Sequence, residues 1–213
     1  MYSVVLSLFL RIGLDMKSLQ EVKENNIGIW LTPGLNIHRN PLCGRNFEYF
    51  SEDPLISGKM AAAMVNGIQS QHISACAKHF CANNKEENRS HCDSILSEHA
   101  LREIYLKGFE ICVKESQPWM IMTAFNMVNG VYTSENHDTI TSILRNEWGY
   151  EGMVTTDWET PTNPCKEIKA GNDMRMPYGD RDKITTALKN GEISRAETEA
   201  CVKRILEMII KLD

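Results

Sequence analysis

The chain has 213 residues, a length that fits one domain or a piece of a larger protein, and 42% of them are apolar, enough to build a core. Its formal net charge is -5, and no run of lysine and arginine is longer than two residues. This charge pattern argues against nucleic acid and anionic membranes as partners.

The first ten residues, MYSVVLSLFL, are almost entirely apolar. They lack the basic start and the small-residue cleavage site of a secretory signal, and they are too short to span a bilayer. We therefore expect neither a signal peptide nor a membrane anchor here. No other stretch reaches transmembrane length, which predicts that the rest of the chain is soluble.

Short apolar runs further along the chain predict buried strands. They cover residues 27–32, 73–80, 119–125, 152–157 and, more weakly, 168–176. Strands separated by helical patterns predict parallel βαβ units. The pattern alone leaves an open doubly wound sheet and a (β/α) barrel as alternatives. No repeat or Gly-, Pro- or Ser-rich linker divides residues 1–213, so we expect a single domain.

Two segments carry the pattern of an amphipathic helix. In residues 97–116, Ser97 is placed to cap the start, and the apolar face consists of Leu101, Ile104, Tyr105, Phe109, Cys112 and Val113. The last segment opens with Ser194 and Glu197 in the spacing of a capping box. Its apolar stripe consists of Val202, Ile205, Leu206 and Ile209.

The seven cysteines form an odd set without a CxxC pair, and most of them lie in apolar segments. This usage indicates free thiols in a reducing compartment, and we expect a cytoplasmic protein. Cys76, His79 and Cys81 are the nearest approach to a metal motif, but strand alternation places them on two faces. Buried structural thiols are therefore favoured over a zinc site.

Polar residues gather where the predicted strands end. Lys78 and His79 close the second run, Phe125 lies at the end of the third, and Asp157 and Trp158 close the fourth. The first run leads into the loop TPGLNIHRNPLCGRNFEYFSEDP. Ligands bind beyond the carboxyl ends of the strands in both architectures. Cations, a carboxylate and an aromatic ring suit a neutral polyhydroxylated ligand. The sequence lacks GxxxxGK[ST] and GxGxxG, which argues against a nucleotide-binding site.

These residues also have structural explanations. Asp157 could cap a helix after its strand, and Lys78 and His79 could form an ordinary polar strand end. Trp158 is more often a core residue than a platform for a sugar. The arginine, asparagine and glutamate of GRNFEYFSEDP could form an ion-pair network that holds a long loop, and NNKEENR could be a solvated loop.

The motifs, taken together, resemble glycoside hydrolase family 3, which includes many bacterial β-glucosidases. TPGLNIHRNPLCGRNFEYFSEDP, KHFCANNKEENR, TAFNMVNG, LRNEWGYEGMVTTDW and AGNDMRMP occur in the family's order. The resemblance runs from about Asn25 to Asp213. It implies an α/β chain similar to the family's amino-terminal TIM-like (β/α) barrel domain, which selects the barrel over the open sheet.

The resemblance also implies roles for individual residues. Asp157 matches the nucleophile of a retaining hydrolase, which forms a covalent glycosyl-enzyme that water then releases. Positions that hold the sugar's hydroxyls match Arg45, Lys78, His79 and Arg89, and Trp158 would lie beside them. The cations are expected to help keep Asp157 ionised. This implies a β-glucosidase type of hydrolysis in carbohydrate metabolism, with a β-glucoside as partner and no metal or organic cofactor.

Three departures from the family pattern are present. The upstream DGP-type aspartate is absent, and Phe125 stands where the family usually has a tyrosine whose hydroxyl bonds near the nucleophile. The general acid/base of the β-glucosidase branch is a glutamate in a second, carboxyl-terminal domain, so we expect it to be absent from this chain. The histidine loop KHFPGHG of the N-acetylglucosaminidase branch is also absent, so we reject that branch. Glu86, Glu87 and Glu159 are weak candidates for an internal general acid. The two carboxyl groups of a retaining enzyme must lie about 5 Å apart, and nothing in the sequence shows this separation.

Residues before about Leu14 do not resemble the family, so residues 1–14 are atypical. We expect a partial barrel that lacks its first strands, with roughly five βα units of the usual eight. Open sheet edges would then favour self-association. Two hypotheses follow. The chain is the catalytic barrel part of a β-glucosidase-type enzyme, active only if its missing parts are supplied, or it is an incompetent fragment that binds sugar weakly or not at all.

Overall fold

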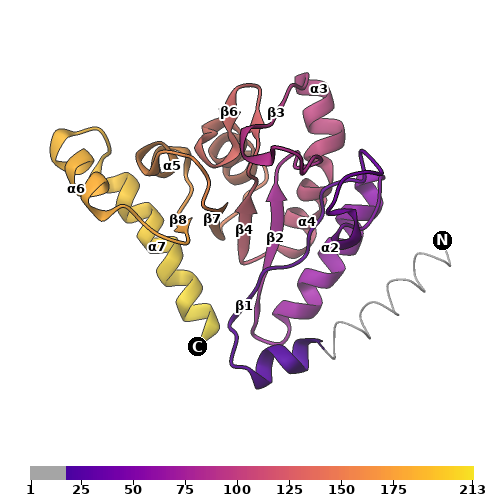
Figure 1. Cartoon of the computed structure of the whole chain (residues 1–213). Coiled ribbons are helices and arrows are strands. Elements are labelled where there is room, and N and C mark those ends of the chain that lie inside the picture. Colours follow the sequence, from indigo (N-terminus) through magenta and orange to yellow (C-terminus); the bar gives the residue numbers. More distant parts are fainter. Residues whose placement is uncertain (1–17) are drawn as a thin grey trace.

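A five-stranded parallel sheet forms the centre of the computed structural model, which describes residues 18–213 (Figure 1). The strands are β1 (Ile29–Trp30), β2 (Ser74–Phe80), β4 (Met120–Thr123), β7 (Met153–Trp158) and β8 (Met174–Met176). Each strand pairs in parallel with the next one along the chain. A doubly wound sheet reverses its strand order at a switch point, whereas a barrel does not. The chain is therefore an α/β half-barrel, as the resemblance implied.

Helices follow the strands in turn. They are α2 (Pro54–Gln69), α3 (Glu98–Ala100), η3 (Leu101–Tyr105), α4 (Lys107–Ser116), η5 (Asp138–Glu147), α5 (Pro164–Ala170), α6 (Arg181–Asn190) and α7 (Arg195–Leu212), and residues 18–24 are also helical. Single turns η1 (Asn46–Glu48), η2 (Arg89–His91) and η4 (Thr133–Glu135) lie in the loops. A small second sheet consists of β3 (Asp93–Ser94), β5 (Met127–Val128) and β6 (Val131–Tyr132).

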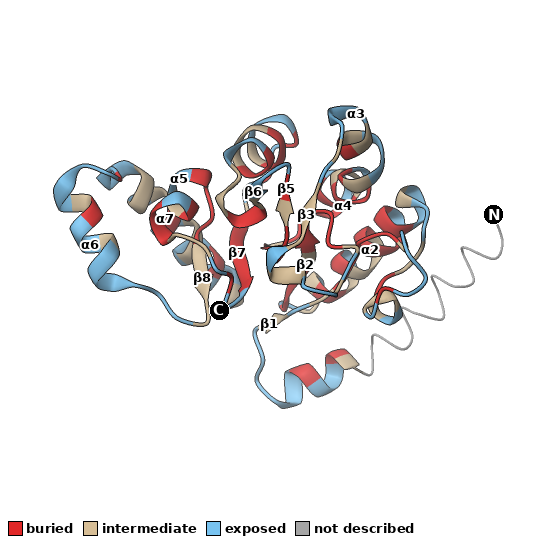
Figure 2. Cartoon of the chain, turned by 45° about the horizontal axis from the view of Figure 1, so that its top comes forward, coloured by how far each residue is buried: buried red, intermediate tan, exposed pale blue. Residues whose placement is uncertain are grey.

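Helices α2 and α4 cover the outer face of the sheet, where side chains of β2, β4 and β7 are fully buried (Figure 2). This core includes Ala75, Ala77, Ile121 and Val154 from the strands and Val65, Ile68, Phe109 and Val113 from the helices. Gly58 lets the two helices approach closely, because a Cβ placed there would lie 2.8 Å from the carbonyl oxygen of Gly108. Burial of this apolar surface is the main stabilising term of the fold.

The carboxyl-terminal helix α7 packs against the other face of the sheet. Met208 of α7 joins Cys76, Met120 and Met153 in one buried cluster. Figure 1 shows α7 running diagonally past the sheet until its end lies near β1. The side chain of Leu212 would lie 3.4 Å from a Cβ placed on Gly28. Helix α7 therefore covers the amino-terminal part of the inner face, away from the strand ends that carry the polar residues.

The structure confirms four of the expected strands and corrects the fifth. The run 168–176 was expected to be one strand, but residues 168–170 belong to α5 and only Met174–Met176 form β8. Gly171 ends α5 with a left-handed backbone (φ +90°), a conformation that glycine adopts without a steric penalty. The apolar pattern therefore spanned a helix end and a short strand.

The helix predictions hold, with differences in the buried faces. Ser97 and Ser194 cap their helices, and Ser194 forms the full capping box with Glu197. Ile104 is exposed. It lies in the π-type turn η3, where one extra residue per turn rotates the side chains away from the positions expected for a regular α-helix. In α7 the expected stripe is only partly covered. Ile205 packs on the inner face, whereas Val202, Leu206 and Ile209 are about half exposed.

The expectations for residues 1–14 concern a segment outside the described residues. In residues 18–213, no helix combines the length and the apolar composition needed to cross a bilayer. All seven cysteines lie in this part of the chain, and each is a free thiol. The same residues contain no cluster of three or more His, Cys, Asp and Glu side chains arranged for a metal ion.

Candidate functional site

The residues singled out from the sequence come from the ends of three neighbouring strands. Asp157 lies in β7, Lys78 and His79 lie in β2, and Phe125 follows β4. Two loops add Arg45, which directly precedes η1, and Arg89, which opens η2. The charges of Arg45, Lys78 and Arg89 all act on the Asp157 carboxylate, so the fold brings these residues to one site.

Asp157 is buried, and only one of its carboxylate oxygens is occupied. Its Oδ1 accepts the backbone N–H of Trp158 at 2.7 Å, whereas Oδ2 accepts no hydrogen bond from the described residues. The next helix, α5, is capped by Asn163, whose side chain accepts from the N–H of Cys165. Asp157 therefore caps no helix, and the capping explanation is wrong. Asp157 therefore keeps one buried carboxylate oxygen without a hydrogen-bond partner among the described residues.

His79 faces this free oxygen. Its ring is 1% exposed, and Nε2 lies 3.8 Å from Oδ2 of Asp157. Asn36 fixes the backbone on both sides, since its amide donates to the His79 carbonyl at 2.9 Å and accepts the His79 N–H at 2.8 Å. Burial, together with the nearby cations, lowers the pKa of His79 well below its ordinary value. The imidazole is therefore neutral at pH 7.

Glu48 bridges two of the cations. It pairs with Arg45, and its Oε2 lies 3.2 Å from Nζ of Lys78. Burial alone would raise the pKa of Glu48, but the hydrogen bond from Arg45 and the charge of Lys78 lower it below the ordinary value. The ion-pair network considered from the sequence is thus present, and it lies within the site. Both cations also lower the pKa of Asp157 through their charge.

Arg89 rests on an aromatic ring. Its guanidinium carbon lies 4.2 Å from the centre of the Phe125 ring, within the range of a cation–π contact. Nη1 of Arg89 also donates to Oε2 of Glu86 at 2.8 Å. Phe125 therefore supports Arg89 through its ring face, without the hydroxyl that the family usually has. Trp158 is 50% exposed and does not belong to the core.

Burial dominates the ionisation of Asp157. It raises the pKa of Asp157 above the ordinary value, although the N–H of Trp158 and the charges of Arg45, Arg89 and Lys78 lower it. As expected, the cations favour the ionised form of Asp157. Burial has the larger effect, however, so the net shift of the Asp157 pKa is upward. Binding of a ligand that donates hydrogen bonds to the free oxygen would favour the carboxylate.

The nearby carboxylates differ in their availability. Both oxygens of Glu86 are occupied, Oε1 by the amide of Asn83 and Oε2 by Arg89. Glu87 is exposed and lies 3.5 Å from Nζ of Lys85. Glu159 is also exposed, and its backbone N–H bonds to the carbonyl of Met176. None of these three contacts Asp157.

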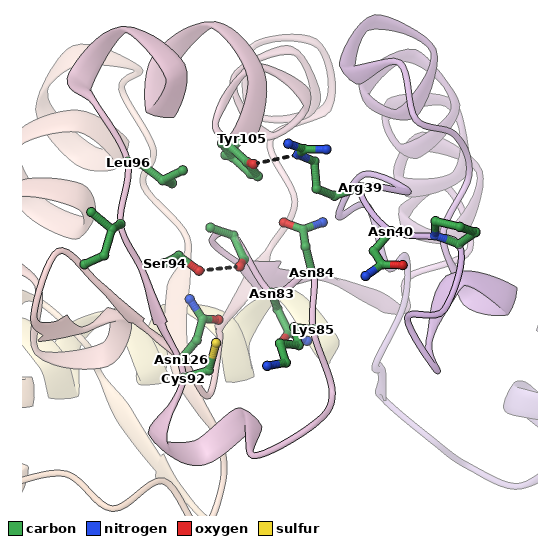
Figure 3. A pocket seen from close by; sticks show the side chains of 13 residues that line it. Arg39, Asn40, Asn83, Asn84, Lys85, Cys92, Ser94, Leu96, Tyr105 and Asn126 are labelled. Atoms are coloured by element: carbon green, nitrogen blue, oxygen red, sulfur yellow. Dashed lines mark hydrogen bonds between the residues drawn. The ribbon is translucent and has the colours of Figure 1, made fainter.

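A cavity of about 480 Å³ lies beside the loop that follows β2 (Figure 3). Asn83, Asn84 and Asn126 line it, together with Arg39, whose Nε donates to the Tyr105 hydroxyl at 3.3 Å. The side-chain carbonyl oxygens of these three asparagines accept no hydrogen bond from the described residues. Asp157, Lys78 and His79 do not line this cavity, but Asn83 does, so the cavity adjoins the site on β7 through the residue that contacts Tyr49.

Two residues of the site, Tyr49 and Asn83, were missing from the sequence prediction, and Glu48 was considered there only as part of a structural ion-pair network. Glu48, Tyr49 and Asn83 make the contacts that hold Arg45, Lys78 and His79. Glu48 had a signal, since an acid three residues after Arg45 in a helical turn lies on the same side. Tyr49 and Asn83 had none, because their contact joins residues 34 positions apart.

The chain has close sequence relatives with named activities. The family "Glycosyl hydrolase family 3 N terminal domain" matches residues 9–208, which begins earlier than the expected start near Asn25. Beta-glucosidase A of Butyrivibrio fibrisolvens is 54% identical over 180 residues, which is 84% of this chain and 22% of that protein. Thermostable beta-glucosidase B of Acetivibrio thermocellus is 47% identical over 193 residues, or 89% of this chain and 26% of that protein.

A solved structure shows the same fold. Beta-glucosidase 3B of Thermotoga neapolitana, in complex with alpha-D-glucose, superposes with a TM-score of 0.88 at 49% sequence identity. The similarity covers 91% of this chain and 28% of that chain. The chain thus spans about a quarter of the length of these relatives.

Proposed function

This chain belongs to glycosyl hydrolase family 3 as its amino-terminal domain, and we propose that it carries the nucleophile of a β-glucosidase-type enzyme that hydrolyses O-glycosidic bonds. The observation that supports this best is the free Oδ2 of the buried Asp157, which faces His79 at 3.8 Å among three cations. Cationic and neutral donors around a carboxylate suit the hydroxyls of a sugar ring.

In the proposed reaction, Arg45, Lys78, His79 and Arg89 hold the hydroxyls of a β-glucoside, and Trp158 covers one face of the ring. A lone pair of Asp157 Oδ2 forms a bond to the anomeric carbon. The glycosidic C–O bond breaks, and its electron pair leaves with the aglycone oxygen, which a general acid protonates. Water then attacks the glycosyl-aspartate, gives up a proton to the same group acting as a base, and restores the carboxylate with net retention.

The described residues supply one of the two carboxylates that this reaction uses. Glu48 pairs with Arg45 and Lys78, and Glu86 pairs with Arg89. The lowered pKa of Glu48 makes it a poor proton donor, and both oxygens of Glu86 are occupied. We therefore assign the general acid to a residue outside the described part of this chain.

The same observation favours a second candidate function. If no acid reaches the site, the chain is a catalytically incompetent sugar-binding fragment. The donors around Asp157 would still bind hydroxyls, but an unactivated glycoside would not be cleaved.

Three further proposals concern the cellular compartment, the domain organisation and the self-association of the protein. Its seven free thiols support a reducing compartment such as the cytoplasm. One domain over residues 1–213 is the simplest organisation. Strand β1 ends the row of paired strands, and the neighbouring Ile27 and Leu31 are 46% and 38% exposed. Such an edge supports self-association.

A reagent that needs no acid separates the two functions. The 2-deoxy-2-fluoro-β-glucoside of dinitrophenol has a leaving group that departs without a proton. The proposal predicts a burst of about one dinitrophenolate per chain, because the glycosyl-aspartate forms and then persists. Asp157→Asn should abolish the burst, whereas Asp138→Asn, at an exposed carboxylate, should retain it. Absence of a burst in the unaltered chain would favour the sugar-binding fragment.

A further inference from the structure

Four side chains form a continuous polar chain that ends at the free oxygen of Asp157. Nδ2 of Asn83 lies 3.2 Å from Oε1 of Glu86 and 3.3 Å from the hydroxyl of Tyr49. The Tyr49 hydroxyl lies 3.2 Å from Nδ1 of His79. Nε2 of the same ring lies 3.8 Å from Oδ2 of Asp157. Tyr49, His79 and Asn83 are at most 3% exposed, so water does not compete for these contacts.

The carboxylate of Glu86 sets the direction of the chain. An ionised carboxylate only accepts hydrogen bonds, so Asn83 must present its NH₂ group to Oε1. Arg89 donates to Oε2 of Glu86 and keeps the carboxylate in place. A flipped Asn83 amide would set its own oxygen against the carboxylate, which is repulsive. The NH₂ group of Asn83 is therefore also the group that faces Tyr49.

The orientation passes from Asn83 to His79 through the tyrosine hydroxyl. The Tyr49 oxygen accepts from Asn83, which leaves its single hydrogen to be donated. Among the described residues, Nδ1 of His79 is the one acceptor within hydrogen-bond distance of that hydroxyl. Nδ1 must then be the unprotonated nitrogen. Burial and the neighbouring cations lower the pKa of His79, so the ring is neutral and carries its proton on Nε2.

We propose that Tyr49 and Asn83 are positioning residues that hold His79 as the Nε2–H tautomer, so that its N–H points at Oδ2 of Asp157. The donor then serves the carboxylate in the free site and a sugar hydroxyl in the occupied one. The opposite tautomer would direct a lone pair at the carboxylate and repel it. This catalytic consequence rests on the proposed function, whereas the tautomer itself does not.

The tautomer can be measured directly on the chain. In ¹⁵N-histidine-labelled protein, two-bond correlations from the ring protons distinguish a protonated nitrogen from an unprotonated one. The His79 signals are assigned by their loss in His79→Gln. We expect a protonated Nε2 and an unprotonated Nδ1. A protonated Nδ1 in the unaltered chain would overturn the proposal.

A variant that reverses the direction of the hydrogen bonds between residue 83, Tyr49 and His79 provides a sharper test. In Asn83→Asp, made together with Glu86→Gln so that two carboxylates do not face each other, the new carboxylate accepts from Tyr49. The tyrosine oxygen must then accept from His79, and the proton is expected to move to Nδ1. Tyr178→Phe, at an exposed ring, should leave the His79 signals unchanged. An unchanged tautomer in the folded double variant would contradict the proposal.

A second variant covers the case in which this double variant does not fold. Tyr49→Phe removes only the hydroxyl, and the His79 signals are expected to move toward a mixture of both tautomers. Unchanged signals in this variant would also contradict the proposal. Because neither readout needs turnover, loss of the dinitrophenolate burst with an intact Nε2–H signal would refute the proposed function and leave this inference standing.

Discussion

Nε2 of His79 in β2 and Oδ2 of Asp157 in β7 lie 3.8 Å apart at the ends of two strands that are separated by β4. Both residues are buried, and neither atom forms a hydrogen bond to the described residues. The separation is longer than a normal hydrogen bond. A sugar hydroxyl placed beside the pair, within about 3 Å of both atoms, could donate to the carboxylate and accept from the imidazole. This pair therefore marks the position of a bound hydroxyl in the proposed site.

The ionisation of Asp157 should control the rate at low pH. Because its pKa is raised, the dinitrophenolate burst should accelerate with rising pH through an inflection above the ordinary value for aspartate, about 3.9. Lys78→Met removes a charge that lowers this pKa, so the inflection should move to higher pH at saturating reagent. Lys59→Met, at an exposed ion pair, is the control. A shift to lower pH in Lys78→Met would contradict this electrostatic account.

Removal of the buried charge should stabilise the fold at neutral pH. The folded protein binds the Asp157 proton more tightly than the unfolded chain, so its contribution to stability is lost as pH rises through the raised pKa. Asp157→Asn should therefore melt at a higher temperature than the unaltered chain at pH 7. The difference should shrink as pH falls through the raised pKa and disappear well below the ordinary value of about 3.9, where both states are protonated. Scanning calorimetry at several pH values measures it, and a pH-independent difference would count against this origin.

The contact between α2 and α4 requires a glycine. In Gly58→Ala, the new methyl group would meet the Gly108 carbonyl and the Ile111 side chain at 2.8 Å. We expect a loss of about 1–3 kcal/mol in the free energy of unfolding by urea. Gly67→Ala lies in the same helix with no heavy atom within 4 Å, and it should gain about 0.5–1 kcal/mol. Equal effects at both positions would show that close helix packing is not the cause.

The Phe125 ring should contribute to sugar binding through Arg89. In Phe125→Leu the guanidinium loses an aromatic face worth about 0.5–2 kcal/mol, which corresponds to roughly 2- to 30-fold weaker binding. Calorimetric titration with glucose measures the dissociation constant. The control is Phe47→Leu, because Phe47 is 83% exposed. Equal affinities in Phe125→Leu and the unaltered chain would remove Phe125 from the binding site.

The parts of the fold that follow from local pattern were predictable. Apolar runs that end in Lys78, His79 and Asp157 located the strand ends, and parallel strands necessarily bring such ends together. The choice between barrel and open sheet depended on strand order, which no local pattern encodes. The run 168–176 was predicted as one strand, and this was wrong because a helix ends at Gly171 inside the run.

Contacts that depend on how loops fold were not predictable. Tyr49 reaches His79 and Asn83 only after the loop before α2 packs against the end of β2. The buried face of α7 is likewise chosen by the inner face of the sheet, which selects Met208 and leaves Leu206 exposed. The raised pKa of Asp157 reflects burial, which a count of neighbouring cations in the sequence does not reveal.

The central claim is that the Asp157 carboxylate attacks the anomeric carbon. Peptide mass analysis after incubation with the 2-deoxy-2-fluoro-β-glucoside of dinitrophenol tests it most directly, with His79→Gln as a variant that retains the carboxylate. We expect the mass of one fluoroglucosyl group on the peptide that contains Asp157, with fragment ions that place it on this residue, and slower labelling in His79→Gln. A label on Glu48, Glu86 or any other residue, or no label at saturating reagent, would contradict the claim.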